Sequence, residues 1–361
     1  MPKVSFNNKK GNFHETLKNA VERYFTEKNI AKTGDWRLFS KTIILISAAL
    51  GLYLSLLLMD LPTWLSILES AALGFVSAAI GFNVMHDANH GSYSKNKTLN
   101  EILGLTMNAL GGNAFIWKTK HNITHHTYTN IDGLDDDIAK SPLIRMAPTQ
   151  VWKPAHRIQH IYIYFLYAIS SFAWVFLTDM DKYFRRKINN TPFTNIPTKE
   201  HIIFWLSKIL YVVFYIAVPV YFVGWAAWGV GFAVMHVVMG VTLSLVFQLA
   251  HMVEEVEHDY YVKDEEFIDS EWAIHQIRTT ANFSPNSPLI SWFVGGLNYQ
   301  IEHHLFPRIS HVHYPAISKI VKEVCLDYNV KYYEAPTLWS AIVSHTKMLK
   351  TFGKKPVLVN S

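Results

Sequence analysis

The stretch that decides the fold is WLSILESAALGFVSAAIGFNVMHDANH, residues 64–90. Its first part, residues 64–85, is an apolar run close to the ~20 residues that a helix needs to cross the hydrocarbon layer. Another apolar run, residues 42–59, precedes it, and Asp60-Leu61-Pro62 separates the two. Because no Lys or Arg occurs between Lys41 and Lys95, the pattern predicts a transmembrane helical hairpin.

The same pattern returns later in the chain, where no Lys or Arg occurs between Lys208 and Lys263. Here the predicted helices span residues 203–223 and 226–250, and Gly224-Trp225 separates them. The fold class predicted is therefore an all-α membrane protein with four transmembrane helices in two hairpins and a helical cap. A further apolar stretch, residues 158–178, is assigned to the membrane interface, because an even number of crossings must separate histidine clusters that share one site.

Composition supports a membrane protein and excludes other classes. Of the 361 residues, 50% are hydrophobic and only 17% are charged, whereas soluble domains carry about 25% charged residues. The single cysteine, Cys325, excludes an internal disulfide and a cysteine-based metal cluster. A net charge of +5 without a binding motif argues against nucleic acid and favours contact with anionic membrane lipid.

Charge also predicts the orientation. The tips between paired crossings contain no Lys or Arg, so the basic residues lie on one side, which the positive-inside rule makes the cytoplasm. We expect both termini and the histidine clusters there. Residues 1–41 form a cytoplasmic amphipathic segment in which Phe13, Leu17, Val21 and Tyr24 share one helical face. That face lies either on the membrane surface or against the cytoplasmic cap.

Three short strings gather histidines at helical spacing: His86-Asp87-Ala88-Asn89-His90, His121-Asn122-Ile123-Thr124-His125-His126 and Gln300-Ile301-Glu302-His303-His304. Residues four apart share a helix face, so each i, i+4 pair can hold one metal ion. The adjacent histidines, His126 and His303, point about 100° away and can reach a second ion. One histidine alone is usually structural, but seven at repeated spacing predict a site for two metals.

The type of ligand narrows the choice of metal. Imidazole suits zinc, copper, iron and nickel, and a closed zinc site uses about four ligands. A dinuclear iron centre that activates oxygen fits a nitrogen-rich shell with open positions.

These strings resemble the three histidine boxes of the membrane fatty acid desaturases, in the family's order, over about residues 83–315. The glutamine that opens the third box, Gln300, resembles the front-end and related acyl desaturase branch, as do Thr279, Thr280 and Asn282. The resemblance implies that residues 42–361 form a desaturase domain. That domain would use two iron ions and O2 to insert a double bond into an acyl chain of a lipid or acyl-CoA.

The resemblance also implies roles for single residues. His251 stands where the family carries a further ligand at the end of the fourth crossing, whereas Phe247 stands where an asparagine would be expected. Gln300 stands where other branches carry a histidine and is either a ligand or a supporting residue, as are Asp87, Asn89 and Glu302. The run Asp135–Asp137 either orients ring nitrogens in the same way or belongs to a solvated loop or helix cap, and the second assignment is favoured. The metal ligands implied are His86, His90, His121, His125, His126, His251, His303 and His304.

The electron donor is expected to be a separate ferredoxin or cytochrome b5, because the sequence contains neither a His-Pro-Gly-Gly haem motif nor a nucleotide-binding glycine fingerprint. Two basic patches either dock that carrier or contact anionic lipid. They are Lys182, Arg185, Arg186 and Lys187, and Lys347, Lys350, Lys354 and Lys355.

Two alternatives stay open at this point. A related hydroxylase or acetylenase would use the same boxes. A metal or haem transporter would place its polar ligands near the membrane midplane, where only His236 lies in this sequence. The sequence leaves open the double-bond position, chain length, acyl carrier, donor and oligomeric state.

Overall fold

The computed structural model describes residues 4–8, 11–139, 142–189, 191–193, 195–258 and 267–356. These residues are mostly helical. Strands occur only as short pairs within these ranges: β1 (Ser5–Phe6) with β4 (Phe267–Ile268), β2 (Lys187–Ile188) with β3 (Thr191–Pro192), and β5 (Asn282–Phe283) with β6 (Glu334–Ala335).

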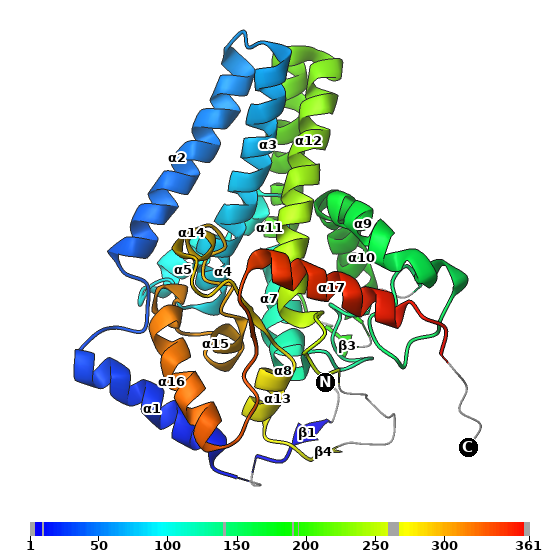
Figure 1. Ribbon diagram of the computed structural model, residues 1–361. Coiled ribbons are helices and arrows are strands. Elements are labelled where there is room, and N and C mark those ends of the chain that lie inside the picture. The colour runs from blue at the N-terminus through cyan, green and yellow to red at the C-terminus, as the bar shows by residue number, and fades with distance from the viewer. Residues whose placement is uncertain are drawn as a thin grey trace.

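Four helical spans are long and apolar enough to cross a membrane: Trp36–Leu58, Thr63–His90, Pro154–Arg185 and Thr198–His251. The first is α2 (Trp36–Leu58), and it packs along α3 (Thr63–Ile80) after a short loop (Figure 1). Below α3 the chain continues through a π-helical turn, η1 (Gly81–Met85), into α4 (His86–His90). The first histidine box is thus a direct extension of a long apolar helix.

The last span folds back on itself. It comprises α11 (Thr198–Val212), η5 (Val213–Ala217) and α12 (Val218–His251), and Gly224 within it has a φ of 77°. In a straight helix, residues 13 apart would be about 20 Å apart, yet the Trp228 indole nitrogen donates to the Tyr215 carbonyl at 2.8 Å. The chain therefore reverses at Gly224, where glycine tolerates the positive φ and where the sequence suggests a break.

Small residues let α3 approach α12 closely. A Cβ atom at Gly74 would lie 2.3 Å from the Met235 carbonyl oxygen, and one at Gly231 would lie 3.0 Å from the Ser70 hydroxyl. The backbone of α3 at Gly74 therefore meets the backbone of α12, and the backbone of α12 at Gly231 meets the Ser70 side chain.

The third span comprises η3 (Pro154–Ile158), α9 (Gln159–Ala173), η4 (Trp174–Thr178) and α10 (Asp179–Arg185). It contains the stretch assigned to the interface from the sequence. In Figure 1, α9 and α10 lie beside the lower part of α12, below the level at which α2 and α3 are joined. The Ser171 hydroxyl lies 2.9 Å from Nδ1 of His236 and ties α9 to α12.

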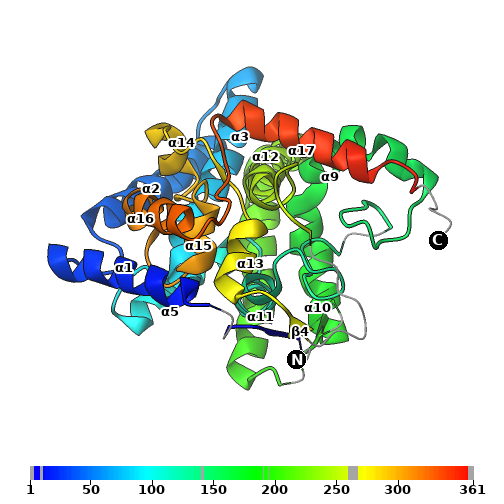
Figure 2. The same ribbon diagram turned by 60° about the horizontal axis from the view of Figure 1, so that its bottom comes forward.

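The remaining helices gather at one end of the long helices and form the cap (Figures 1 and 2). Within it, α1 (Phe13–Lys28) buries Phe13, Leu17, Val21 and Phe25 in a core shared with α13 and α16. Of the two alternatives for this helix, packing against the cap is the one observed. Tyr24 packs against this core while partly exposed, and Phe25 is buried in it as well. The other cap helices are α5 (Lys97–Gly104), α6 (Thr106–Ala109), α7 (Ala114–Lys118), η2 (Thr119–His125), α8 (His126–Tyr128), α13 (Trp272–Arg278), α14 (Pro288–Phe293), α15 (Gln300–Leu305), η6 (His311–His313), α16 (Tyr314–Asp327) and α17 (Leu338–Phe352).

Candidate metal centre

The fold brings all the histidines implied as ligands into one buried cluster just below the long helices. The first box lies on α4, the second on η2 and α8, and the third on α15, while His251 is the last residue of α12. Each of these side chains is buried: His86, His90, His121, His125, His126, His251, His303 and His304.

Ligand atoms of these histidines form three overlapping groups, each within 4.8 Å. One joins His86, His90, His121 and His303; another joins His125, His251 and His304; a third joins His126, His303 and His304. Consecutive residues of the third box thus divide between the first two groups, as expected for a site with two metal positions. His251, which lies outside the boxes, falls within the second group.

The second box departs from the expected spacing. His121 and His125 were expected to share one ion, but they belong to different groups. The reason is local: η2 is a π-helix, in which i, i+5 residues align rather than i, i+4. Accordingly, Nε2 of His121 lies 3.2 Å from Nε2 of His126.

In four of these histidines, an oxygen atom from outside the cluster contacts Nδ1 and thereby fixes the orientation of the ring. Nδ1 of His125 lies 3.1 Å from Asp135, and that of His251 lies 3.4 Å from the Thr279 carbonyl. The corresponding partners of His303 and His304 are the Tyr314 hydroxyl at 3.2 Å and the Gln276 amide oxygen at 2.9 Å. Outer partners of this kind fix the orientation of metal-binding histidines.

The opposite ring nitrogens point into the cluster. Among the described residues, Nε2 of the four oriented rings has no hydrogen-bond partner, and the same holds for Nε2 of His90 and Nδ1 of His126. Buried polar atoms are almost always paired. Several converging unpaired nitrogens therefore fit metal ions.

Electrostatics also favour neutral rings in most of the cluster, with His125 as the exception. Burial lowers the pKa of His121, His126, His303 and His304 well below the ordinary value, and the neighbouring imidazoles lower it further. Burial alone would lower the pKa of His125 too, but the charge and hydrogen bond of Asp135 raise it. Neutral imidazole is the form that binds metal.

The expected supporting residues differ in what they contact. Asp87 lies 4.0 Å from Nδ1 of His86 and 3.1 Å from Nδ1 of His311, so it borders the cluster. Nε2 of His311 lies 3.0 Å from the buried Lys41 ammonium, which also donates to Asn83. These contacts, through Asp87, His311 and Lys41, link the first box to α2.

Asn89 and Glu302 do not orient a ring. The Asn89 amide donates to the Gly104 carbonyl at 3.3 Å. The Glu302 carboxylate accepts from Asn282 at 2.8 Å and from Tyr332 at 2.9 Å, and burial raises its pKa to about 7. Gln300 is buried at the first residue of α15, beside the third box.

The assignment of Asp135–Asp137 to a solvated loop is wrong, whereas the alternative, that the run orients ring nitrogens, fits Asp135. All three are buried. Asp135 contacts His125, Asp137 pairs with Lys120, and Asp136 pairs with Lys182. Lys182 is consequently buried too, and it does not belong to an exposed docking patch.

Sequence reasoning also missed Gln276, Tyr314 and Trp117. The Trp117 ring stacks on His121 with ring centres 4.3 Å apart. No spacing rule singles out Gln276 or Tyr314, because they reach the cluster from other elements. Trp117 alone carried a signal, since it lies four residues before His121.

The carboxylate behind His125 provides a test of this arrangement. Asp135→Asn keeps the shape but removes the charge, so we expect metal affinity to fall about 10–100-fold, the usual effect of losing an outer partner. Metal content by elemental analysis, measured across a chelator titration, checks this result. Asp132→Asn is the matched control, since Asp132 contacts Thr149 and Gln150 instead. Equal metal retention in both variants would contradict the role of Asp135.

Comparison with known proteins agrees with this geometry. A family model described as fatty acid desaturase matches residues 62–336, most of the chain. A relative from Arthrospira platensis named sn-1 linoleoyl-lipid 6-desaturase is 36% identical over 98% of this chain and 96% of its own length.

Two further relatives extend the comparison. A protein of the same name from Synechocystis sp. is 35% identical, covering 98% of both chains. An acyl-lipid (8-3)-desaturase from Mortierella alpina is 33% identical over 95% of this chain and 78% of its own length. With the histidine cluster in place and these matches over nearly the whole chain, the protein belongs to the fatty acid desaturase family.

Proposed function

We propose that this fatty acid desaturase, an oxidoreductase of the membrane, holds two iron ions in the histidine cluster and uses O2 to insert a double bond into an acyl lipid. The observation that carries the proposal is the convergence of unpaired, buried ring nitrogens in groups that draw on all three boxes and His251.

The first iron would be held by His86, His90, His121 and His303, and the second by His125, His251 and His304. His126 lies within reach of both third-box histidines. Gln300, at the edge of the cluster, is a further candidate ligand. Two irons would supply the oxidising power that breaks an unactivated C–H bond, which side-chain acids and bases cannot do. The protein itself would hold the histidine rings in place through their outer partners and would exclude water from the buried cluster.

The substrate follows from the relatives' names. Two of them act on linoleoyl lipid at position 6, and another is an acyl-lipid (8-3)-desaturase. We propose a lipid-bound acyl chain as substrate, desaturated at position 6.

For the membrane topology we propose two hairpins, α2 with α3 and α11 with α12, with the cap, the iron centre and both termini in the cytoplasm. The span containing α9 would lie at the interface. The position of α9 beside the lower part of α12 (Figure 1) supports the interface placement of that span. The absence of basic residues between the paired crossings supports a cytoplasmic cap.

Electrons would come from a separate ferredoxin or cytochrome b5. Lys350, Lys354 and Lys355 are exposed near the end of α17 and offer a positive surface for an acidic carrier. Arg185 and Lys187 are also exposed, but the burial of Lys182 makes that second patch smaller than the sequence suggests.

His236, the histidine within α12 that lies near the membrane midplane, does not support the transporter alternative. Nδ1 of His236 lies 2.9 Å from the Ser171 hydroxyl, and its Nε2 lies 2.9 Å from the Tyr211 hydroxyl. Both ring nitrogens are therefore engaged in holding helices together.

Expression in a host with a simple lipid profile tests the proposal. Supplied with linoleate, the host should accumulate a product with one additional double bond at position 6 in its membrane lipids, identified by gas chromatography and mass spectrometry of double-bond derivatives. A host carrying the empty vector is the control. A hydroxylated or acetylenic product, or no new product despite iron-loaded protein, would overturn the assignment.

A further inference from the structure

We propose that Lys41 and His311 are positioning residues of the first iron site. They act through the carboxylate of Asp87, which lies behind the ring of His86. The inference rests on the proposed iron sites, and it adds to them a buried support that begins at α2 and ends at the first histidine box.

The rings of the first iron site have fewer partners outside the cluster than those of the second. All three histidines of the second site have an oxygen beside Nδ1. Among the described residues, His303 is the one histidine of the first site with such an oxygen within hydrogen-bond distance. The Asp87 carboxylate lies 4.0 Å from Nδ1 of His86, which is too far for a hydrogen bond. It therefore acts on this ring through its charge, and the position of that charge matters.

One oxygen of Asp87 is held by η6 and by the residue before it. Oδ2 accepts a hydrogen bond from the Ser310 hydroxyl at 2.7 Å and another from the backbone amide of His311 at 3.2 Å. Nδ1 of the His311 ring lies 3.1 Å from the same oxygen. The other oxygen, Oδ1, is the one that faces His86. These contacts therefore fix the direction in which the carboxylate presents its second oxygen.

Lys41 determines which nitrogen of His311 carries the hydrogen. Nε2 of His311 lies 3.0 Å from the Lys41 ammonium, which can donate hydrogen bonds but cannot accept them. Nε2 must therefore be the acceptor, and a neutral imidazole then carries its hydrogen on Nδ1, beside the Asp87 carboxylate. Without the ammonium, the ring can also adopt the other tautomer, which places a lone pair against the negative charge.

Lys41 is itself held in a fixed position. Its ammonium donates to Oδ1 of Asn83 at 2.7 Å and lies 5.6 Å from the centre of the Trp292 ring. The amide nitrogen of Asn83 donates to the carbonyls of Ala79 and Phe293, both at 2.9 Å. Because these two bonds fix the amide, its oxygen faces the ammonium.

A merely mechanical link between α2 and the cap would not need charged groups. Lys41, His311 and Asp87 are exposed by only 7%, 3% and 1%. Taking an ammonium and a carboxylate out of water is costly, and apolar side chains of similar volume often hold a core together as well or better. The placement of this network directly behind a ligand ring therefore indicates a role at the metal.

Two replacements of His311 test its role. His311→Leu removes both ring nitrogens, whereas His311→Gln keeps one acceptor for the ammonium and one donor for the carboxylate. In a chelator titration of the iron-loaded protein, His311→Leu should lower the affinity for one iron about 10-fold, the lower end of the usual effect of losing an outer partner, because His311 acts through Asp87. His311→Gln should restore the wild-type affinity.

Mössbauer spectra report on each iron separately. In protein loaded with the Mössbauer isotope of iron, His311→Leu should shift the signal of one iron and leave the other at its wild-type position. Lys41→Met keeps the length of the side chain but removes the ammonium, so it should shift the same signal. A defect in folding would reduce both signals together and would not move one of them.

The control for His311 lies in the same turn. His313 is also buried, but its Nε2 lies 3.2 Å from the Thr33 carbonyl. His313→Leu therefore removes a buried ring from η6 without touching the carboxylate behind the first box, and it should leave both iron signals unchanged.

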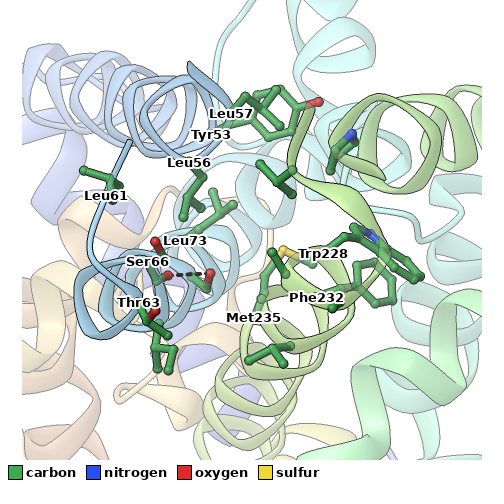
Figure 3. A pocket seen from close by; sticks show the side chains of 18 of the residues that line it. Tyr53, Leu56, Leu57, Leu61, Thr63, Ser66, Leu73, Trp228, Phe232 and Met235 are labelled. Atoms are coloured by element: carbon green, nitrogen blue, oxygen red, sulfur yellow. Dashed lines mark hydrogen bonds between the residues drawn. The ribbon is translucent and has the colours of Figure 1, made fainter. Parts of the chain in front are cut away.

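The control for Lys41 lies on the same helix. Tyr53 lines a cavity of about 450 Å³ between the hairpins, near the outer end of α2 (Figure 3). Its hydroxyl donates to the Phe214 carbonyl at 2.6 Å, so Tyr53→Phe also removes a polar contact between α2 and the rest of the protein. This variant should lower the unfolding temperature in detergent and leave both iron signals unchanged.

Failure of the inference and failure of the proposed iron sites give different results. Wild-type spectra and iron affinity in both His311→Leu and Lys41→Met would overturn the inference. An equal loss of both irons in His311→Leu and His313→Leu would also overturn it, because the network would then serve the stability of the cap. If His311→Leu does not fold, Lys41→Met decides, and a wild-type spectrum in that variant overturns the inference. A wild type that binds no iron in the cluster would instead overturn the proposed iron sites.

Discussion

His303→Ala is expected to abolish double-bond formation and to remove iron from the purified protein. His303 is one of the two histidines shared between the histidine ligand groups, since it lies both with His86, His90 and His121 and with His126 and His304. Its Nδ1 is held by the Tyr314 hydroxyl, and its Nε2 has no partner among the described residues. Losing an outer partner alone costs about 10–100-fold, so losing the ring itself should cost more than about 100-fold in product formation.

Product by gas chromatography and iron per polypeptide by elemental analysis measure the two effects. His156→Ala is the matched control. His156 is equally buried in the cap, but its ring contacts the Lys153 backbone amide and the Pro142 carbonyl. The His156→Ala variant should keep its iron. Wild-type product from His303→Ala would refute the metal centre, and iron loss in both variants would trace the defect to folding.

The second large effect is expected at His251, which lies outside the three boxes. Its Nε2 is unpaired among the described residues and meets His125 and His304 within 4.8 Å. His251→Ala should remove the iron held by that group, lowering iron content by about half and activity by more than about 100-fold.

Another histidine of the same helix provides the control. His236 is also buried in α12, but its two nitrogens contact Ser171 and Tyr211. His236→Ala leaves these hydroxyls without that partner, which costs about 1–3 kcal/mol of stability. It should therefore lower the unfolding temperature in detergent and leave iron content unchanged. A full complement of iron in His251→Ala would exclude it as a ligand.

The local features of the site could be predicted from the sequence. The box histidines and their order follow from residue identity and spacing, whereas the resemblance to the desaturases implied the extra histidine after the fourth apolar run. The pairing within α4 was also predictable, because His86 and His90 lie one α-helical turn apart and share a group. The pairing within the second box was not, because η2 adopts π-helical geometry, which redirects His121 toward His126.

Outer partners were the least predictable part. Asp135 resembles a residue of an acidic surface loop, and only the packed cap shows that it is buried against His125. Gln276 and Tyr314 reach the third box from α13 and α16. Nothing in their own neighbourhood in the sequence indicates a ring beside them.

By itself, the sequence determined the apolar helices, the break at Gly224 and the histidine chemistry. Each depends on residue type and on periodicity over a few turns, which act locally along the chain. Only the tertiary structure decided which histidines lie close enough to share an ion and which oxygens orient them. These features depend on contacts between segments far apart in the chain, such as His86 with His303 and Ser70 with Gly231, and such contacts are set by how close-packed helices fit together.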